Sequence, residues 1–140
     1  MPHIVIDYSA NLDARVDIQS LCIVLRDATV ATGVASLAGI RVRAVRADHW
    51  VIADGDPQHA SIDISVRLRG GRSLEIRKSA ITAIFAAAEA YCAETLAASS
   101  LLLSMEMREI DPALSPKTSS IRRYLPGEEQ LPTLNPTSPA

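Results

Sequence analysis

The segment HASIDISVRLRGGRS, residues 59–73, decides the fold, because its alternation of apolar and polar side chains is unbroken over ten residues. One face would carry Ala60, Ile62, Ile64, Val66 and Leu68, and the other Ser61, Asp63, Ser65 and Arg67. A period of two is typical of a β-strand with one buried face. Gly70 and Gly71 end the alternation, and Ser73 can cap a helix by accepting a hydrogen bond from its first turn. The segment therefore predicts a strand followed directly by a helix.

The same order of elements is expected on both sides of this segment. Before it we expect a strand at His3–Tyr8, a helix capped by Asp17 and ending near Thr32 at Gly33, and a strand at Ile40–Val45 extending through Trp50–Ala53. After it we expect a helix from Ser73 to about Ala98 and a strand at Leu101–Ile110. Apolar residues recur in both helices at spacings of three and four, which indicates one buried face each. The predicted stripes are Ile18, Leu21, Cys22, Leu25 and Ala28 in the first helix, and Ile76, Ala80, Ile84, Phe85, Ala88, Tyr91 and Cys92 in the second.

This order predicts an α+β fold that repeats a β-α-β unit, at about residues 2–53 and again at 59–110. Two helices can cover only one face of the resulting four-stranded sheet. The polar face would meet either solvent or neighbouring subunits in a closed ring. We expect one folded domain over residues 1–125. Residues 126–140 contain four prolines and little aliphatic periodicity, so this tail is expected to be disordered.

Composition excludes several classes of protein. A formal net charge of −2 argues against nucleic acid or an anionic membrane as a partner. No apolar run approaches the roughly 18 residues of a membrane span, and no secretory signal is visible, so a cytoplasmic protein is expected. The two cysteines, Cys22 and Cys92, are predicted to be reduced and buried. Neither they nor the scattered histidines have metal-ligand spacing, and no nucleotide-binding loop is present, so no metal site is expected.

Pro2 is the first residue with unusual chemistry. A small second residue normally allows the initiator methionine to be removed, which would leave a secondary amine at the chain start. An ordinary α-amino group titrates near 8, and burial or neighbouring cations would lower that pKa. The neutral amine could then act as a general base near pH 7. A proline that merely starts a strand is the alternative.

Two arginines could supply the positive charge that an anionic substrate needs. Arg41 is expected to point away from the apolar face of its strand. Arg72 lies between the glycines and Ser73, where a helix begins and offers unpaired amide hydrogens to an anion. A guanidinium can hold a carboxylate with two parallel hydrogen bonds. Each arginine taken alone could equally be a solvated surface charge.

Five segments together resemble the 5-carboxymethyl-2-hydroxymuconate Δ-isomerase family of the tautomerase superfamily. They are Met1-Pro2-His3, Ala31-Thr32-Gly33, Leu37-Ala38-Gly39-Ile40-Arg41, Trp50-Val51-Ile52-Ala53-Asp54-Gly55 and Gly71-Arg72-Ser73-Leu74-Glu75. The resemblance runs in order from residue 2 to about 125. It implies a homotrimer without metal or organic cofactor, and a place in the bacterial meta-cleavage pathway for homoprotocatechuate.

The resemblance also implies roles for three residues. Pro2 matches the catalytic amino-terminal proline, and Arg41 and Arg72 match the arginines that bind the substrate. The expected substrate is a small enol or keto acid with two or three carboxylates, such as 5-carboxymethyl-2-hydroxymuconate, converted from the dienol to the conjugated 2-oxo isomer. The proline-rich tail is not part of the family pattern.

Two alternatives stay open from the sequence. One is another proline-dependent activity of the superfamily, such as enol-acid tautomerisation, dehalogenation or decarboxylation. The other is a non-catalytic homotrimeric scaffold, for which Met1 would be retained. A nucleic-acid-binding module is disfavoured because no basic, aromatic-rich face is predicted.

Overall fold

The alternating segment forms β3 (Ala60–Arg69), and its five aliphatic side chains are each at most 1% exposed. This strand is therefore confirmed, together with the face that it buries. The computed structural model describes residues 1–126. Of the expected disordered tail, residues 127–140 lie outside the described residues.

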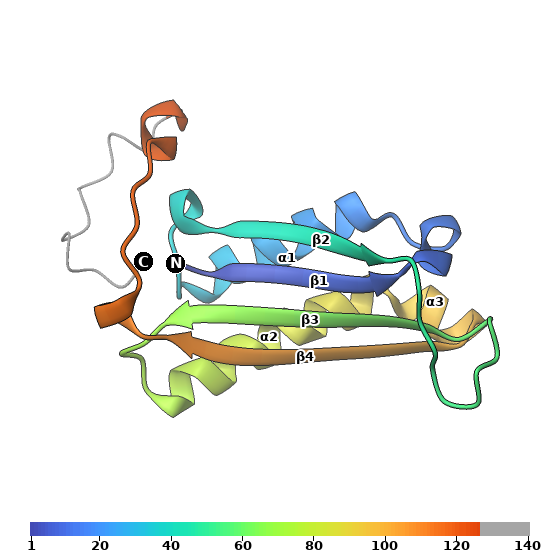
Figure 1. Ribbon diagram of the computed structural model, residues 1–140. Helices are drawn as coiled ribbons and strands as arrows, with labels where there is room; N and C mark the ends of the chain where they lie inside the picture. Colours follow the sequence, from blue (N-terminus) through green and yellow to red (C-terminus); the bar gives the residue numbers. More distant parts are fainter. Residues whose placement is uncertain (127–140) are drawn as a thin grey trace.

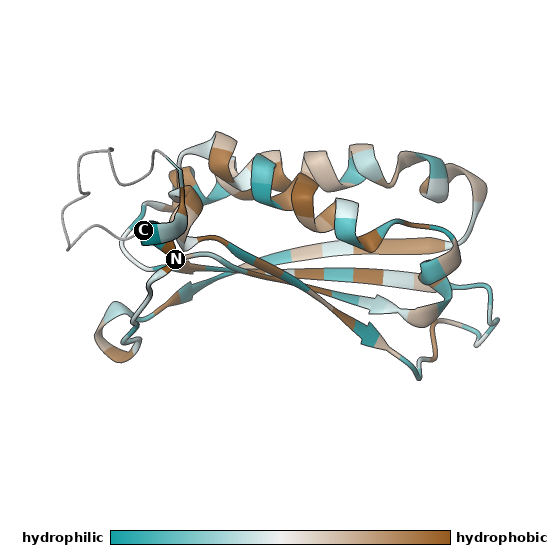
Figure 2. Cartoon of the chain, turned by 90° about the horizontal axis from the view of Figure 1, so that it is seen from above, coloured by the Kyte–Doolittle hydropathy of each residue, from teal (hydrophilic) through white to brown (hydrophobic). Residues whose placement is uncertain are grey.

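The four strands form one mixed sheet in the order β2-β1-β3-β4. The other strands are β1 (His3–Ser9), β2 (Arg41–Ala47) and β4 (Leu101–Ile110). Strand β1 pairs in parallel with β2, β3 pairs in parallel with β4, and β1 and β3 run antiparallel in the centre. Helix α1 (Ile18–Thr32) connects the first parallel pair and α2 (Leu74–Tyr91) connects the second. Both helices cover the same face (Figures 1 and 2), so the expected repeat of β-α-β units is confirmed.

The helix ends follow the predicted capping residues. The side chain of Asp17 accepts a hydrogen bond from the Ser20 amide at 3.1 Å, and that of Ser73 accepts one from Ile76 at 3.2 Å. Gly33 ends α1 with φ of 78°, a left-handed conformation that favours glycine. Among the described residues, no helix is both long and apolar enough to cross a lipid bilayer.

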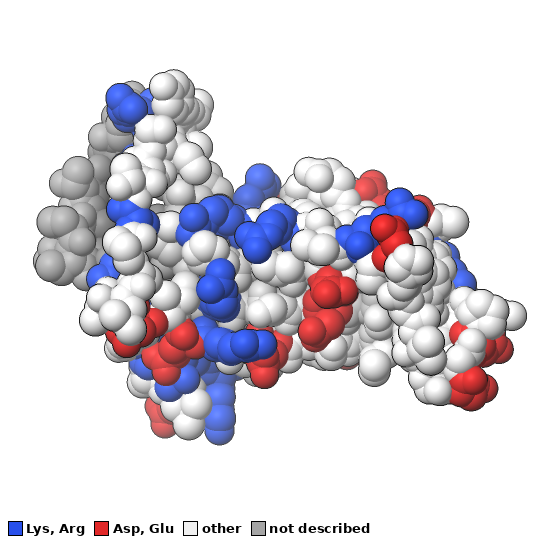
Figure 3. Space-filling model, viewed as in Figure 1, with Lys and Arg blue, Asp and Glu red and all other residues white. Residues whose placement is uncertain are grey.

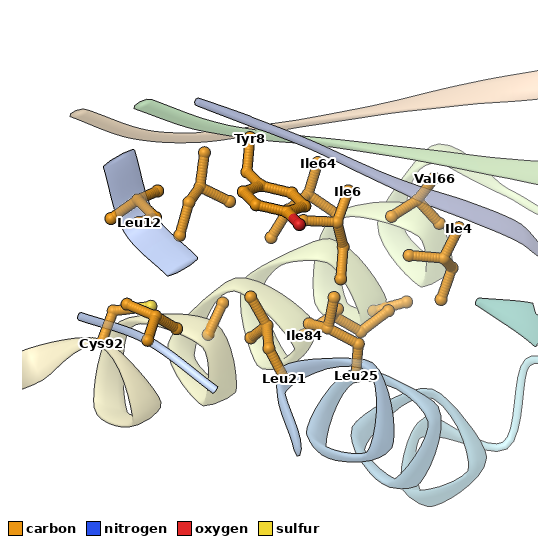
Figure 4. Packing of buried hydrophobic residues seen from close by; sticks show 14 of the residues in the cluster. Ile4, Ile6, Tyr8, Leu12, Leu21, Leu25, Ile64, Val66, Ile84 and Cys92 are labelled. Carbon is orange, nitrogen blue, oxygen red and sulfur yellow. The ribbon is translucent and has the colours of Figure 1, made fainter. Parts of the chain in front are cut away.

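The core lies between the helices and the sheet and is almost entirely aliphatic. Ile6 and Ile64 are opposite each other on the central strands and are fully buried. Figure 4 shows them pointing towards Leu21 and Leu25 of α1 and Ile84 of α2. Burial of each such side chain stabilises the fold by about 1.5–3 kcal/mol.

The predicted buried stripes are only partly confirmed: Ile76 is exposed, and five further members are partly buried, namely Ile18, Cys22, Ala28, Phe85 and Tyr91. Ile76 is 50% exposed, because it lies in the first turn of α2, ahead of the part of the helix that contacts the core. Cys22 is only partly buried on α1, whereas Cys92 is fully buried.

The predicted extension of β2 and the single long second helix are both wrong. Strand β2 ends at Ala47, and the chain then enters a turn in which the Gly55 amide donates to the Ile52 carbonyl. The second helix breaks at Cys92, whose amide donates to two carbonyls, and continues as the short α3 (Ala93–Ala98). In both places, hydrogen bonds within a turn take the place of the regular bonds of a strand or helix.

The loop between β2 and β3, residues 48–59, is fixed through His59. The imidazole of His59 makes hydrogen bonds to Asp54 Oδ1 at 2.7 Å and to Ser100 Oγ at 2.6 Å. Its backbone carbonyl accepts from Asn11 Nδ2 at 2.8 Å and from the indole of Trp50 at 3.3 Å. The loop is thus held against the starts of both β3 and β4.

We expect His59→Ala to loosen this loop and to lower the free energy of unfolding by about 1–3 kcal/mol, since two side-chain hydrogen bonds are lost. Trp50 is the only tryptophan of the chain, so its quenching by acrylamide reports on the loop directly. Quenching should increase in His59→Ala. Gln58→Ala is the matched control, because the exposed Gln58 side chain makes none of these bonds. Equal quenching in the two variants would contradict the role of His59.

Candidate active site

The start of the chain lies in a cavity of about 200 Å³ at one end of the sheet, here called the N-terminal cavity. Its lining includes three arginines from β2 and β3 and one lysine from the segment after β4. The lining residues are Met1, His3, Arg41, Arg67, Arg69, Ile110, Ser115, Pro116 and Lys117. Of the predicted site residues, Arg41 lines this cavity beside Met1, whereas Pro2 and Arg72 do not line it.

Pro2 is fully buried beside this cavity, and Met1, which precedes it, is only partly buried. The terminal amine of Met1 has its pKa lowered from 8.0 to about 5. Burial is the largest cause, and the positive charges of Lys117, Arg72, Arg69 and Arg41 follow in that order. An amine in this position is neutral at pH 7 and can accept a proton.

Of the two arginines predicted from the sequence, Arg41 is the one that lines the cavity. Its backbone amide donates to the Pro2 carbonyl at 3.2 Å, which ties the first residue of β2 to the chain start. Its Nη2 lies 2.5 Å from His3 Nε2. Because a guanidinium only donates, His3 Nε2 accepts, and the ring must be neutral. Burial, with Arg41 as the next cause, lowers the pKa of His3 to about 4, consistent with that assignment.

Arg72 lies near the chain start but does not line the N-terminal cavity. Its Nη1 donates to the Arg69 carbonyl at 3.2 Å, and its Nη2 donates to the carbonyl of Val34. A guanidinium has five N–H groups, so these bonds leave others that can face an anion. Its charge also contributes to the lowered pKa of the terminal amine. Arg72 therefore lowers the pKa of the terminal amine and also links two backbone segments by hydrogen bonds.

A row of basic residues, with His3 neutral among three arginines, crosses the open face of the sheet. The register places Arg41 beside His3, His3 beside Arg67 and Arg67 beside Arg108, on all four strands. Figure 3 shows Lys and Arg gathered over the end of the open face where β1 begins. Within residues 1–126, neither Arg67 nor Arg69 forms an ion pair with a carboxylate. This end of the molecule is suited to binding an anion.

A larger hollow of about 340 Å³ lies at the opposite end of the sheet, against the loop of residues 48–59. Its lining includes two carboxylates, Asp48 and Asp56, but no lysine or arginine. It lacks both the amine and the cations, so the chemistry described above belongs to the N-terminal cavity.

Sequence reasoning missed Lys117, Arg69 and Arg67 as site residues. Arg67 and Arg69 carry a signal in the alternation of β3, because odd-numbered residues point to the open face. Lys117 carries no periodic signal, since it lies in an irregular segment after the last strand. Only the folded chain brings it to the cavity.

Comparison with known proteins gives one family. Residues 2–125 match the model of the family described as 5-carboxymethyl-2-hydroxymuconate isomerase. The 5-carboxymethyl-2-hydroxymuconate Delta-isomerase of Escherichia coli is 33% identical over 121 residues, which cover 86% of this chain and 96% of that protein.

Solved structures agree with this match. A 5-carboxymethyl-2-hydroxymuconate delta-isomerase has a TM-score of 0.82 at 28% identity, covering 89% of this chain and 92% of its own. The isomerase of Deinococcus radiodurans R1 has a TM-score of 0.79 at 31% identity, covering 89% and 94%. At 19% identity, a symmetric trimer of fused 4-OT has a TM-score of 0.61, covers 84% and 92%, and shows likeness of fold alone.

Proposed function

The chain belongs to the 5-carboxymethyl-2-hydroxymuconate isomerase family, and from that membership we propose that Pro2, once Met1 is removed, is the acid–base catalyst of this isomerase. The proposed substrate is an unsaturated 2-hydroxy acid with two or three carboxylates, of the type of 5-carboxymethyl-2-hydroxymuconate. The product is its conjugated 2-oxo isomer. Residues 1–125 would form the catalytic domain.

The proposed reaction moves one proton and needs no other reactant. The neutral Pro2 nitrogen takes the proton of the 2-hydroxyl group, the electron pair of that O–H bond forms the 2-oxo group, and the double bonds shift along the chain. The protonated nitrogen then delivers the proton to a distant carbon. No atom is gained or lost, so the amine returns to its neutral form after each turnover.

The cations have two proposed tasks in this reaction. Arg41 and Arg72 would bind carboxylates of the substrate, and they would oppose the negative charge that develops on the 2-oxygen. The same charges disfavour protonation of the amine and so keep the base neutral at pH 7.

One observation carries this proposal: the terminal amine is half-buried among cations that lower its pKa well below 7. In the structure that amine belongs to Met1. The Pro2 nitrogen is one residue further along the chain. It belongs to a fully buried ring, and the Pro2 carbonyl accepts a hydrogen bond from the Arg41 amide. Removal of Met1 would therefore expose a more deeply placed amine to the same charges.

A homotrimer in the cytoplasm is the proposed state of the protein. The sheet face away from the helices carries apolar side chains such as Val45 and Leu102, which are 49% and 61% exposed. A fused 4-OT of similar fold is a symmetric trimer. Packing of this face in a closed ring would bury these side chains. A monomer mass by light scattering would contradict the trimer.

The proposed function is tested by following the loss of dienol absorbance for a tricarboxylate dienol and for the monocarboxylate enol of phenylpyruvate. We expect the wild type to prefer the tricarboxylate. Arg72→Ala should lower kcat/KM for the tricarboxylate by about 10–100-fold, the cost of one charge-assisted hydrogen bond, and should affect the monocarboxylate less.

The ratio of the two substrates is the decisive measurement. Arg72→Ala also loses the bond to Val34 and can lower the fraction of folded enzyme, but that loss cancels in a ratio. Arg72→Lys is the matched variant that keeps the charge. Equal losses on both substrates would remove the substrate-binding role of Arg72, and no turnover of either substrate by the wild type would overturn the proposed function.

A further inference from the structure

The segment after β4 crosses the end of the sheet where β1 begins (Figure 1). Asp111 starts this crossing: its carboxylate accepts from the Ala113 amide at 2.9 Å, and its carbonyl accepts from Ser115 Oγ at 2.7 Å. A short 3-10 helix, Pro112–Leu114, lies inside this turn. The turn directs residues 115–117 back over the chain start, where all three line the N-terminal cavity.

Lys117 borders two cavities at once. One is the N-terminal cavity, and the other is a neighbouring hollow of about 270 Å³ lined by Met1, Ser36, Ala38, Gly39, Lys117, Ser119 and Arg122. Met1 and Lys117 are the two residues common to both linings. The side chain of Lys117 thus lies beside residue 1, between a group of strand arginines on one side and Arg122 on the other.

The electrostatic effects agree with this position. After burial, Lys117 is the largest of the causes that lower the pKa of the terminal amine. The pKa of Lys117 is itself lowered, by burial first and then by Arg69, Arg41 and Arg122. The directions of these pKa shifts agree with the cavity linings, which place Lys117 beside Met1 and next to Arg41 and Arg69. An anion bound there would relieve the repulsion among them.

We propose that Lys117 is a substrate-binding residue, which donates to a carboxylate of the polyanionic substrate next to the Pro2 nitrogen. This inference rests on the proposed function for the place of the reaction. It adds a third cation to Arg41 and Arg72, and it assigns that cation to a segment outside both β-α-β units. Because Lys117 borders both cavities, it would bind a carboxylate apart from those that Arg41 and Arg72 are proposed to bind.

The first test uses the only two lysines of the chain. Lys117→Gln should raise KM for a tricarboxylate dienol by about 10–100-fold, the loss of one charge-assisted hydrogen bond, and should change KM for the enol of phenylpyruvate by less than about threefold. The acid limb of kcat/KM should also move to higher pH, since one of the cations that lower the pKa of the amine is removed. Lys117→Arg keeps the positive charge, so its KM and its acid limb should stay close to those of the wild type.

Lys78→Gln is the matched control. It removes the same charge from an exposed position on α2, away from the cavities. If Lys117→Gln behaves like Lys78→Gln on both substrates, the inference is overturned and the proposed function stands.

The second test does not depend on turnover. Limited acetylation followed by mass spectrometry measures the reactivity of both lysines in the full-length protein. Propane-1,2,3-tricarboxylate should protect Lys117 and leave Lys78 unchanged, and acetate at the same ionic strength should protect neither. If the wild type proves inactive, the proposed function fails, but protection of Lys117 still supports its role in binding an anion. Without protection, that role is overturned.

Discussion

Blocking the Pro2 nitrogen is expected to lower kcat/KM for isomerisation of the dienol by about 10²–10⁴-fold, the range typical of general acid–base catalysis. Pro2→Leu would do so genetically, since a bulky second residue retains Met1. Acetylation of the mature amine would do so chemically. Pro2→Ala is the matched control, because a small second residue still permits removal of Met1 and leaves a primary amine in place. Intact mass spectrometry establishes the chain start of each sample.

The pH dependence follows from the direction of the pKa shift. A cationic acid whose pKa is lowered is neutral over a wider range, so the base form is present at pH 7. For the amine of Met1, burial and the four cations lower the pKa to about 5. We expect the same cations to lower the pKa of a Pro2 amine once Met1 is removed, so kcat/KM should fall in acid as that amine is protonated. Unchanged turnover in the blocked enzyme would contradict the assignment.

Replacing Arg41 by Met is the second change with a large expected effect. Arg41 lines the N-terminal cavity together with Arg67 and Arg69, and its proposed bidentate bond to a substrate carboxylate would be lost. We expect kcat/KM for a tricarboxylate to fall by about 100-fold, and by more if both hydrogen bonds contribute fully. Arg43→Met is the matched control, because Arg43 points to the same face two residues further along β2 but does not line the cavity.

His3 gives this variant an independent spectroscopic readout. Burial and Arg41 are the two largest causes that hold the pKa of His3 near 4. Without Arg41 the pKa should rise towards 6.5, because the neighbouring charge and the donor to Nε2 are both gone. NMR titration of the imidazole protons measures this change. A His3 pKa that stays near 4 in Arg41→Met would contradict the contact between the two side chains.

The sequence predicts the fold well wherever a periodic pattern meets a capping residue. The alternation in β3 identifies a buried face, and Asp17, Ser73 and Gly33 mark helix ends that the structure confirms. It fails where irregular bonds decide the conformation. At the break, the Cys92 amide donates to two carbonyls, and no residue type in the sequence predicts that arrangement.

The residues of the candidate site also fall into those that the sequence predicts and those that it does not. Pro2 and Arg41 could be predicted, because chemistry and family motifs single them out. Arg72 was also predicted, but its bond to the Val34 carbonyl could not be, since that bond depends on how the chain after α1 lies against the segment before α2. Lys117 stands 115 residues after Pro2 in sequence and reaches the same cavity only through the turn at Asp111.

The row formed by Arg41, His3, Arg67 and Arg108 across four strands has a practical meaning for kinetics. Arg41 and Arg67 carry positive charge on either side of the neutral His3, and neither forms an ion pair among residues 1–126, so a small multivalent anion is attracted to this end of the sheet. Phosphate, sulfate and citrate in a reaction buffer would then compete with the natural acid, and Michaelis constants measured in them would come out too high. Uncharged or zwitterionic buffers at fixed chloride are therefore the proper medium in which to rank substrates of this enzyme.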